Sequence, residues 1–177
     1  MATPLTEALA AGNREAFAAL YDRLGTRLFA TARTMLDSTT EAEDVVHDLF
    51  VDLARFRHRL ASVSDLDGYV FTMLRHAVGR RIRRRVLDRR AVDRLGAERR
   101  DAGFSALPEE PADDSLAAAV AALPAPQREV IALKIDGGLT FAEIAAVVGV
   151  SASTAASRYR YALDKLRSAL ASEESRR

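Results

Sequence analysis

The sequence predicts an all-α protein: two small helical domains joined by a flexible linker, with a helix-turn-helix in the C-terminal domain. Three observations support this prediction. Apolar residues recur at spacings of three and four along most of the chain, as they do on one face of a helix. Periodicity fades between about residues 88 and 114, where glycine, proline and charged residues gather. Helix-capping signals and a turn glycine then punctuate the C-terminal part. The predicted parts are residues 1–88, a linker at 89–114, and residues 115–177.

The first two predicted helices have clear apolar stripes. One helix is expected over about residues 14–36, and a second begins near Thr40. The first stripe contains Phe17, Leu20, Tyr21, Leu24, Leu28, Ala32 and Met35. The second contains Ala42, Val45, Val46, Leu49, Phe50 and Leu53. The opposite face of the second helix is acidic, with Glu41, Glu43, Asp44, Asp48 and Asp52.

A third helix is predicted after a loop at residues 57–63, because the apolar period breaks there. Ser64, followed three residues later by Asp67, resembles a capping signal. The expected buried residues of this helix are Leu66, Val70, Met73, Leu74, Ala77 and Val78. Five arginines follow within residues 80–85. Three amphipathic helices of this kind can bury their apolar faces against one another as a bundle.

The C-terminal part begins with two short predicted helices. Ser115 is the expected cap of the first, which carries Leu116, Ala119, Val120 and Leu123. Pro124 ends that helix, and Pro126 lies where a first helical turn tolerates proline. The next helix is expected to bury Val130, Ile131, Leu133 and Ile135 and to end at residues 137–138.

Two further helices form the predicted helix-turn-helix. Thr140 and Glu143 form a capping box before a short helix that ends at Gly149, and Ser151 starts the last helix. The inward residues of these helices are Ile144, Ala145 and Val148, then Ala155, Tyr159, Ala162, Leu163 and Leu166. The last helix would lie in a DNA major groove, with Ser153, Thr154, Ser157, Arg158, Arg160 and Tyr161 outward. An ordinary helical hairpin in a bundle is the alternative.

Composition and charge favour a cytoplasmic protein with charged partners. The 177 residues include no cysteine, no spanning apolar stretch and no N-terminal secretion pattern, so disulfides, thiolate catalysis and membrane insertion are not expected. The net charge is +1, yet residues 75–100 hold eleven arginines against three acids. This separation of charge predicts two partners of opposite charge; a solvated basic helix is the alternative.

Two separate stretches resemble sigma factors of the extracytoplasmic-function (ECF) type in the sigma-70 superfamily. Residues 124–130, 139–145, 148–151 and 154–158 resemble the fourth conserved region of that family. Residues 42–50 are similar to its second region. Residues 68–76 and the arginine run look like its melting and −10-reading helix. Two motifs in this order, joined by a linker, are far more specific than either one alone.

The resemblance implies a non-enzymatic transcription initiation factor without a cofactor or metal. Core RNA polymerase, through its clamp helices and flap, and promoter DNA are the expected partners, and an anti-sigma factor is a further one. A monomer is expected when the chain is free. The family's clamp-binding positions correspond to Glu43, Asp44, His47 and Asp48. The resemblance places −10 recognition and melting on Arg57, Arg59, Ser62, Tyr69, Arg75, His76, Arg80, Arg83 and Arg84, and −35 recognition on Thr154, Ser157, Arg158, Arg160 and Tyr161.

The −10 pocket is expected to hold an unstacked base beside the aromatic residues Tyr69 and Phe71, although one of the two must face the core. The family usually has tryptophan at Tyr69, asparagine at His76 and glutamine at His47. Ala155 and Ala156 replace a valine and a frequent basic residue. These departures leave the promoter sequence open.

Two other function classes compete with this interpretation. A repressor or activator would also use a helix-turn-helix, but it would not need the acidic second helix or the basic third one. A metalloenzyme is suggested by Asp44, His47 and Asp48 on one helical face, yet there is no second ligand-rich site or phosphate-binding loop. A polymerase pull-down distinguishes a sigma factor from a repressor.

Overall fold

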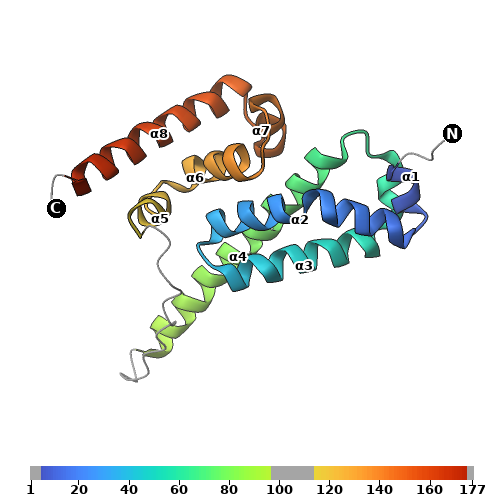
Figure 1. Ribbon diagram of the computed structural model, residues 1–177. Coiled ribbons are helices and arrows are strands. Elements are labelled where there is room, and N and C mark those ends of the chain that lie inside the picture. Colours follow the sequence, from blue (N-terminus) through green and yellow to red (C-terminus); the bar gives the residue numbers. More distant parts are fainter. Residues whose placement is uncertain (1–4, 97–113, 175–177) are drawn as a thin grey trace.

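The computed structural model describes residues 5–96 and 114–174, and within these ranges every regular element is helical. Figure 1 shows an N-terminal bundle with the C-terminal helices lying along one side of it. The bundle contains α1 (Leu5–Ala10), α2 (Arg14–Leu36), α3 (Thr39–Arg55), η1 (Arg57–Ser62) and α4 (Leu66–Gly96). The C-terminal unit contains α5 (Asp114–Ala121), α6 (Ala125–Ile131), η2 (Ala132–Asp136), α7 (Phe141–Val148) and α8 (Ala152–Glu174). The all-α prediction is confirmed.

Helices α2 and α3 follow the predicted stripes except at Tyr21, which is 56% exposed and packs its ring edge to face against Phe50. Side-chain caps fix where each helix begins. The Asn13 side chain accepts a hydrogen bond from the amide of Ala16 at 3.0 Å, so α2 starts at Arg14. Asp37, with φ 54°, ends α2 in the left-handed conformation. Ser38 Oγ then accepts from the Glu41 amide at 3.3 Å and starts α3. This tight connection brings α2 and α3 together as an antiparallel pair.

Helix α4 is the longest element, and its C-terminal end extends beyond the bundle (Figure 1). Its cap is Asp65, whose carboxylate accepts from the Gly68 amide at 3.0 Å, so the predicted capping role of Ser64 was wrong. The helix continues to Gly96, which makes residues 89–96 of the predicted linker helical. Most of that linker, residues 97–113, lies outside the described residues.

Two short elements at one end of the bundle were not predicted. Helix α1 packs against η1, which forms a 3₁₀ turn where a loop was expected. Leu9 of α1 and Leu60 of η1 are both buried in the common core. Each element has only six residues, and a helix of that length depends on tertiary packing for its stability.

The C-terminal unit keeps the predicted order of helices but corrects two details, the cap of its first helix and the burial of Ile135. Ser115 lies inside α5 rather than at its cap, and Leu116 is 44% exposed. Ile135 is 62% exposed because the chain forms a π-helical turn over residues 132–136. There the Gly137 amide bonds to the Ala132 carbonyl five residues back, which shifts the buried face away from the regular period.

The bundle and the C-terminal unit share one hydrophobic core. Buried residues from α2 and α4, such as Leu28 and Phe71, belong to the same cluster as Val130, Leu133 and Ile144. Helix α2 contacts η2 and α6, and α4 contacts α7. Of the helices that the model describes, none is long and apolar enough to cross a membrane.

Candidate nucleic-acid interface

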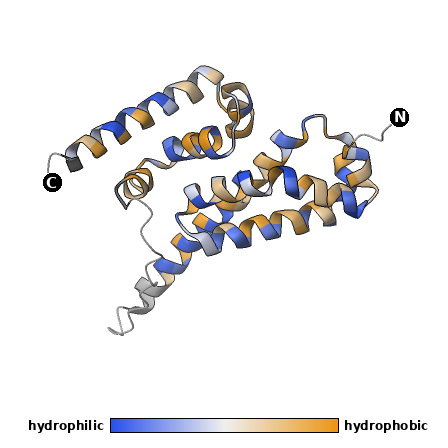
Figure 2. Cartoon of the chain, in the orientation of Figure 1, coloured by the Kyte–Doolittle hydropathy of each residue, from blue (hydrophilic) through white to orange (hydrophobic). Residues whose placement is uncertain are grey.

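The acidic face of α3 is open to solvent. Glu43, Asp44, His47 and Asp48 are all exposed, whereas the buried stripe of α3 faces the bundle (Figure 2). Asp44 differs from the other three because its carboxylate pairs with Arg81 of α4 at 3.1 Å. The structure thus brings the four predicted docking residues together on one surface. In the described parts of the chain, no group of three or more histidine and acidic side chains is arranged to hold a metal ion.

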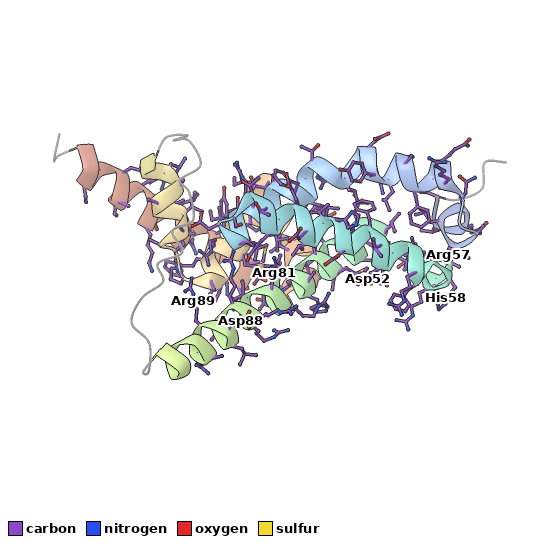
Figure 3. All side chains as sticks on the ribbon, turned by 90° about the horizontal axis from the view of Figure 1, so that it is seen from below. Asp52, Arg57, His58, Arg81, Asp88 and Arg89 are labelled. Atoms are coloured by element: carbon purple, nitrogen blue, oxygen red, sulfur yellow. The ribbon has the colours of Figure 1, made fainter. Side chains whose placement is uncertain are left out.

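The arginines of α4 fall into two groups. Arg80, Arg83 and Arg84 are exposed, as expected of residues that contact DNA phosphates. Arg81 and Arg85 instead turn toward α3 and pair with Glu41; Figure 3 shows Arg81 between the two helices. The Arg85 guanidinium also donates to the Leu36 carbonyl at 2.9 Å. These bonds fix α4 against the α2–α3 connection and leave the other arginines pointing outward.

The η1 turn presents Arg57, Arg59 and Ser62, which are all exposed. Figure 3 shows Arg57 and His58 at the end of α3. Phe56 is an aromatic residue that the sequence did not indicate. The residue is 37% exposed, and the guanidiniums of Arg55 and Arg59 lie 5.3 and 5.2 Å from the centre of its ring. A hollow of about 190 Å³ beside this ring is lined by Phe56, Arg59 and Tyr69, among others. An aromatic ring with adjacent arginines suits a stacked nucleobase.

Tyr69 and Phe71 have different environments. Tyr69 is half-buried and lines the hollow beside Phe56. Phe71 is fully buried, and the guanidinium of Arg27 lies 5.4 Å from the centre of its ring. The prediction that Phe71 borders the base pocket was therefore wrong. Residues 69 and 71 are separated by about 200° around a helix, so the two side chains point to opposite sides.

Arg75 and His76 lie farther along α4, where the C-terminal unit approaches. The Arg75 guanidinium donates to Glu129 of α6 at 2.7 Å, so in this arrangement a predicted DNA-binding cation is paired within the chain. His76 is exposed. Both residues border a cleft of about 410 Å³ between the two parts of the molecule. Nothing in the local sequence around Arg75 indicates this pairing, because its partner lies 54 residues away.

The helix-turn-helix has the predicted geometry. Thr140 and Glu143 form both bonds of the capping box, and Gly149, with φ 77°, makes the turn between α7 and α8. Hydrogen bonds from the Thr140 backbone and side chain lower the pKa of Glu143, and the nearby cations Arg27 and Lys134 act in the same direction. Phe141 and Tyr159 pack edge to face at 5.5 Å between ring centres.

The predicted DNA-reading residues of α8 are not all on its outer side, because Arg158, which was expected to face outward, borders the cleft toward the bundle. Thr154, Arg160 and Tyr161 are exposed, and Tyr161 is 59% exposed. Ser157 and Arg158 are half-buried, and Arg158 borders the cleft that contains Arg75. The Ser151 hydroxyl accepts from the Thr154 amide at 3.0 Å and caps the first turn. The outward side of this helix offers hydroxyl and guanidinium groups for base edges and phosphates.

Comparison with family models matches both parts of the molecule in the same order. Residues 20–99 match the model of sigma-70 region 2, and residues 113–166 match that of sigma-70 region 4. The chain is an ECF sigma factor of the sigma-70 family. The first match covers most of α2 and all of α3, η1 and α4, and the second covers α5 to α7 and most of α8.

Curated relatives agree with the assignment to the ECF sigma factors. The chain is 29% identical over 183 aligned residues to the ECF RNA polymerase sigma factor SigK of Mycobacterium ulcerans, with 94% of this chain and 91% of the relative covered. It is 28% identical to the SigK proteins of Mycobacterium tuberculosis and Mycobacterium bovis over the same shares. Each alignment includes both helical parts of this sigma factor.

Two solved structures resemble this sigma factor in fold. One is CnrH in complex with the cytosolic domain of CnrY, with a TM-score of 0.68 and 26% identity; 95% of this chain and 96% of the other are covered. The second is the sigma factor RpoE in complex with the anti-sigma factor NepR from Bartonella quintana. Its TM-score is 0.66 at 26% identity, with 86% and 96% of the two chains covered.

Proposed function

We propose that this sigma factor binds core RNA polymerase, directs it to promoters by reading −10 and −35 elements, and assists DNA melting. The observation that carries the proposal is the presence, in one chain that matches both sigma regions, of an exposed acidic face on α3 and exposed cationic faces on α4 and α8. A repressor needs the α8 surface but has no use for the acidic face. The expected site of action is the cytoplasm.

The acidic face of α3 is the proposed polymerase contact. Glu43, His47 and Asp48 are exposed, and the helix that carries them is held by a buried apolar stripe on its other side. A basic surface, such as the clamp helices of the polymerase, would complement these charges and accelerate encounter. Asp44 would join this contact after exchanging Arg81 for a polymerase cation.

The −10 element is assigned to the surface between η1 and α4. A flipped base would enter the hollow beside Tyr69, where Phe56 and Arg59 offer stacking surfaces. Arg57, Arg80, Arg83 and Arg84 would contact the backbone on either side of it. Base stacking in such a pocket provides about 1–3 kcal/mol per base, so the opened strand is stabilised by binding and needs no hydrolysis.

The −35 element is assigned to α8, whose first turns would enter the major groove as in other helix-turn-helix proteins. Thr154, Arg160 and Tyr161 are the exposed residues among those assigned to DNA, and Thr154 lies near the N-terminal end that would approach base edges. Arg158 can join them only if the cleft beside it opens. A contact to a base edge provides about 1–3 kcal/mol of discrimination.

Affinity purification with core RNA polymerase, followed by transcription of promoter fragments selected from genomic DNA, tests the proposal. The decisive variant combines Glu43→Lys with Asp48→Lys, because both residues are exposed and the ion pairs between α3 and the described side chains of α4 involve Glu41 and Asp44 instead. Polymerase binding should fall at least about tenfold, since charged contacts at an interface contribute a few kcal/mol when desolvated. The matched control, Glu15→Lys with Asp22→Lys, makes the same change in charge on the exposed face of α2 and should bind normally.

Retention of full polymerase binding by the α3 variant would remove the docking assignment. Failure of the unmodified chain to bind the polymerase while it still binds DNA specifically would favour a repressor or activator instead. Circular dichroism of both variants provides the folding control, since all four substituted residues are exposed.

A further inference from the structure

The two halves of the molecule are held together by polar contacts as well as by their shared core. Thr34 of α2 donates to Asp136 of η2 at 2.7 Å. Arg27 of α2 donates through Nε to the Gly137 carbonyl at 3.0 Å. Arg75 of α4 pairs with Glu129 of α6. These contacts join α2 and α4 to α6, to η2 and to Gly137, which follow one another in the C-terminal unit. Together they form a single interface between the two parts of the molecule.

Gly137 shows how closely the two parts approach. The residue is buried, and a Cβ atom placed on it would lie 3.1 Å from the Phe71 ring of α4 and 2.6 Å from the Leu133 carbonyl. Arg27 covers that same Phe71 ring while it donates to Gly137. The buried phenyl ring, the arginine and the glycine therefore form a fitted contact between the halves.

This docking brings residues assigned to two different promoter elements into one cleft. Arg75 and His76, assigned to the −10 element, and Arg158, assigned to the −35 element, all line it. Its volume of about 410 Å³ is the size of a small-molecule pocket. A DNA duplex, whose major groove alone is about 12 Å wide, cannot enter a space of this size. Arg158 in particular is half-buried there.

Glu129 binds the guanidinium group of Arg75, the group that would otherwise bind a DNA phosphate. Its carboxylate accepts from the guanidinium Nε at 2.7 Å, and the two side chains are 15% and 33% exposed. A charge-assisted bond of this kind is the one that Arg75 would otherwise make to the DNA backbone. While the pair persists, Arg75 cannot also make that bond to DNA, so Glu129 is an internal competitor.

We propose that α2 and α4 form a docking surface for this chain's own helix-turn-helix unit, and that Glu129 closes the free protein on itself by occupying Arg75. Closure sequesters Arg75 and Arg158, and opening presents both to DNA. The effect of closure on DNA binding rests on the proposed function, but the closed arrangement itself can be measured without polymerase or promoter.

The domain arrangement is tested by distance measurements between spin labels. The chain has no cysteine, so Ala18→Cys on α2 and Ser168→Cys on α8, both exposed, can be labelled without other changes. Pulsed electron spin resonance of the free protein should give one narrow distance distribution. Glu129→Gln should broaden it and shift it to longer distances, and Arg75→Glu with Glu129→Arg should restore the narrow form. A broad distribution in the unmodified sequence, or one that Glu129→Gln leaves unchanged, would overturn the proposal.

The consequence for DNA is tested with a fluorescein-labelled duplex of mixed sequence and the free chain. Glu129→Gln should bind at least about threefold more tightly and increase the salt slope by about one, because one more arginine becomes available to a phosphate. Asp164→Asn is the charge-matched control, since Asp164 is exposed on α8 and pairs with Arg167 of the same helix rather than across the cleft. Equal gains in both variants would contradict internal competition. Loss of polymerase binding, in contrast, would disprove the proposed function without altering either result.

Discussion

Helices α4 and α8 both present arginines to solvent, but the two sets are held differently. Arg75, Arg81 and Arg85 of α4 each pair with a carboxylate from another element. On α8, neither Arg158 nor Arg160 forms an ion pair within the described part of the chain, and Arg160 only approaches the Ser157 hydroxyl at 3.5 Å. The basic charge of α4 is therefore partly neutralised and fixed in direction, whereas on α8 Arg160 is exposed and Arg158 lies half-buried in the cleft without an ionic partner among the described residues.

If α4 contacts DNA as proposed, this difference predicts that it does so with selected arginines rather than with all of the arginines in residues 80–85. Glu41 holds Arg81 and Arg85 against α3, and this leaves Arg80, Arg83 and Arg84 on the outer side. In α8 the first turns combine the exposed cation with hydroxyl groups, which suits the reading of base edges. The predictions below test this division, from the largest expected effect to the smallest.

The largest effect is expected on α8. Arg158→Ala with Arg160→Ala should weaken holoenzyme binding to a selected promoter by about 30-fold or more, since each contact provides about 1–3 kcal/mol. Competition binding with labelled promoter DNA measures this loss. The control, Lys165→Ala with Arg167→Ala, removes the same charge from exposed positions later in α8. Equal losses in the two variants would show that α8 contributes charge alone.

The second-largest effect is expected on the outer side of α4. Arg80→Ala, Arg83→Ala and Arg84→Ala combined should weaken all promoters by a similar factor, about tenfold or more, and reduce the salt slope by about three. Arg81→Ala alone should leave the salt slope nearly unchanged, because its guanidinium already faces Glu41 and Asp44. A salt slope that falls as much for Arg81 as for each outer arginine would refute the separation of α4 into two groups.

The network around Glu41 should affect stability more than DNA binding. Glu41→Gln removes the partner that Arg81 and Arg85 share, and we expect the free energy of unfolding to fall by about 1–2 kcal/mol. Urea unfolding followed by circular dichroism measures the change. The effect is limited because the arginine side chains are about one-third exposed. A decrease in DNA affinity without any loss of stability would mean that Glu41 orients arginines for DNA instead.

The smallest effect is expected at the capping box of α7. Thr140→Ala should lower the free energy of unfolding by about 1 kcal/mol, as the loss of a helix cap usually does.

Glu143 should make the stability of the protein depend on pH. Because the pKa of Glu143 is lowered in the folded protein, its contribution to the free energy of unfolding is present above the ordinary value of 4.5 and is lost as pH falls through the lowered folded value. Glu143→Gln should remove this part of the pH dependence, as urea titrations over that range would reveal. An unchanged profile would contradict the assigned role of the carboxylate.

Sequence patterns predicted the elements whose stability comes from local signals. The bounds of α2, the Thr140–Glu143 capping box and the turn at Gly149 all follow from periodicity or from capping chemistry. Helix α1 and η1 were missed because each is short and depends on contact with the other. The exposure of Ile135 results from a π-helical turn that the 3.6-residue period does not encode.

For the candidate site, the sequence predicted which residues are exposed better than it predicted which of them pair with another part of the chain. The exposed positions of Glu43, Asp48 and Arg160 agree with what patterning predicts. The pairing of Arg75 with Glu129 depends on tertiary docking across 54 residues. Phe56 gave no periodic signal because it follows the end of α3, and only the fold brings it beside Tyr69.

Permanganate footprinting of a selected promoter tests most directly whether α4 melts DNA and α8 positions the complex. With core polymerase and the unmodified chain, thymines near −10 should become reactive. With Tyr69→Ala the thymine signal should fall several-fold while duplex binding is retained, because a stacked base provides about 1–3 kcal/mol. With Arg158→Ala and Arg160→Ala, binding and reactivity should fall together. Full reactivity in the Tyr69 variant, or reactive thymines without this chain, would contradict the assignment of promoter opening to α4.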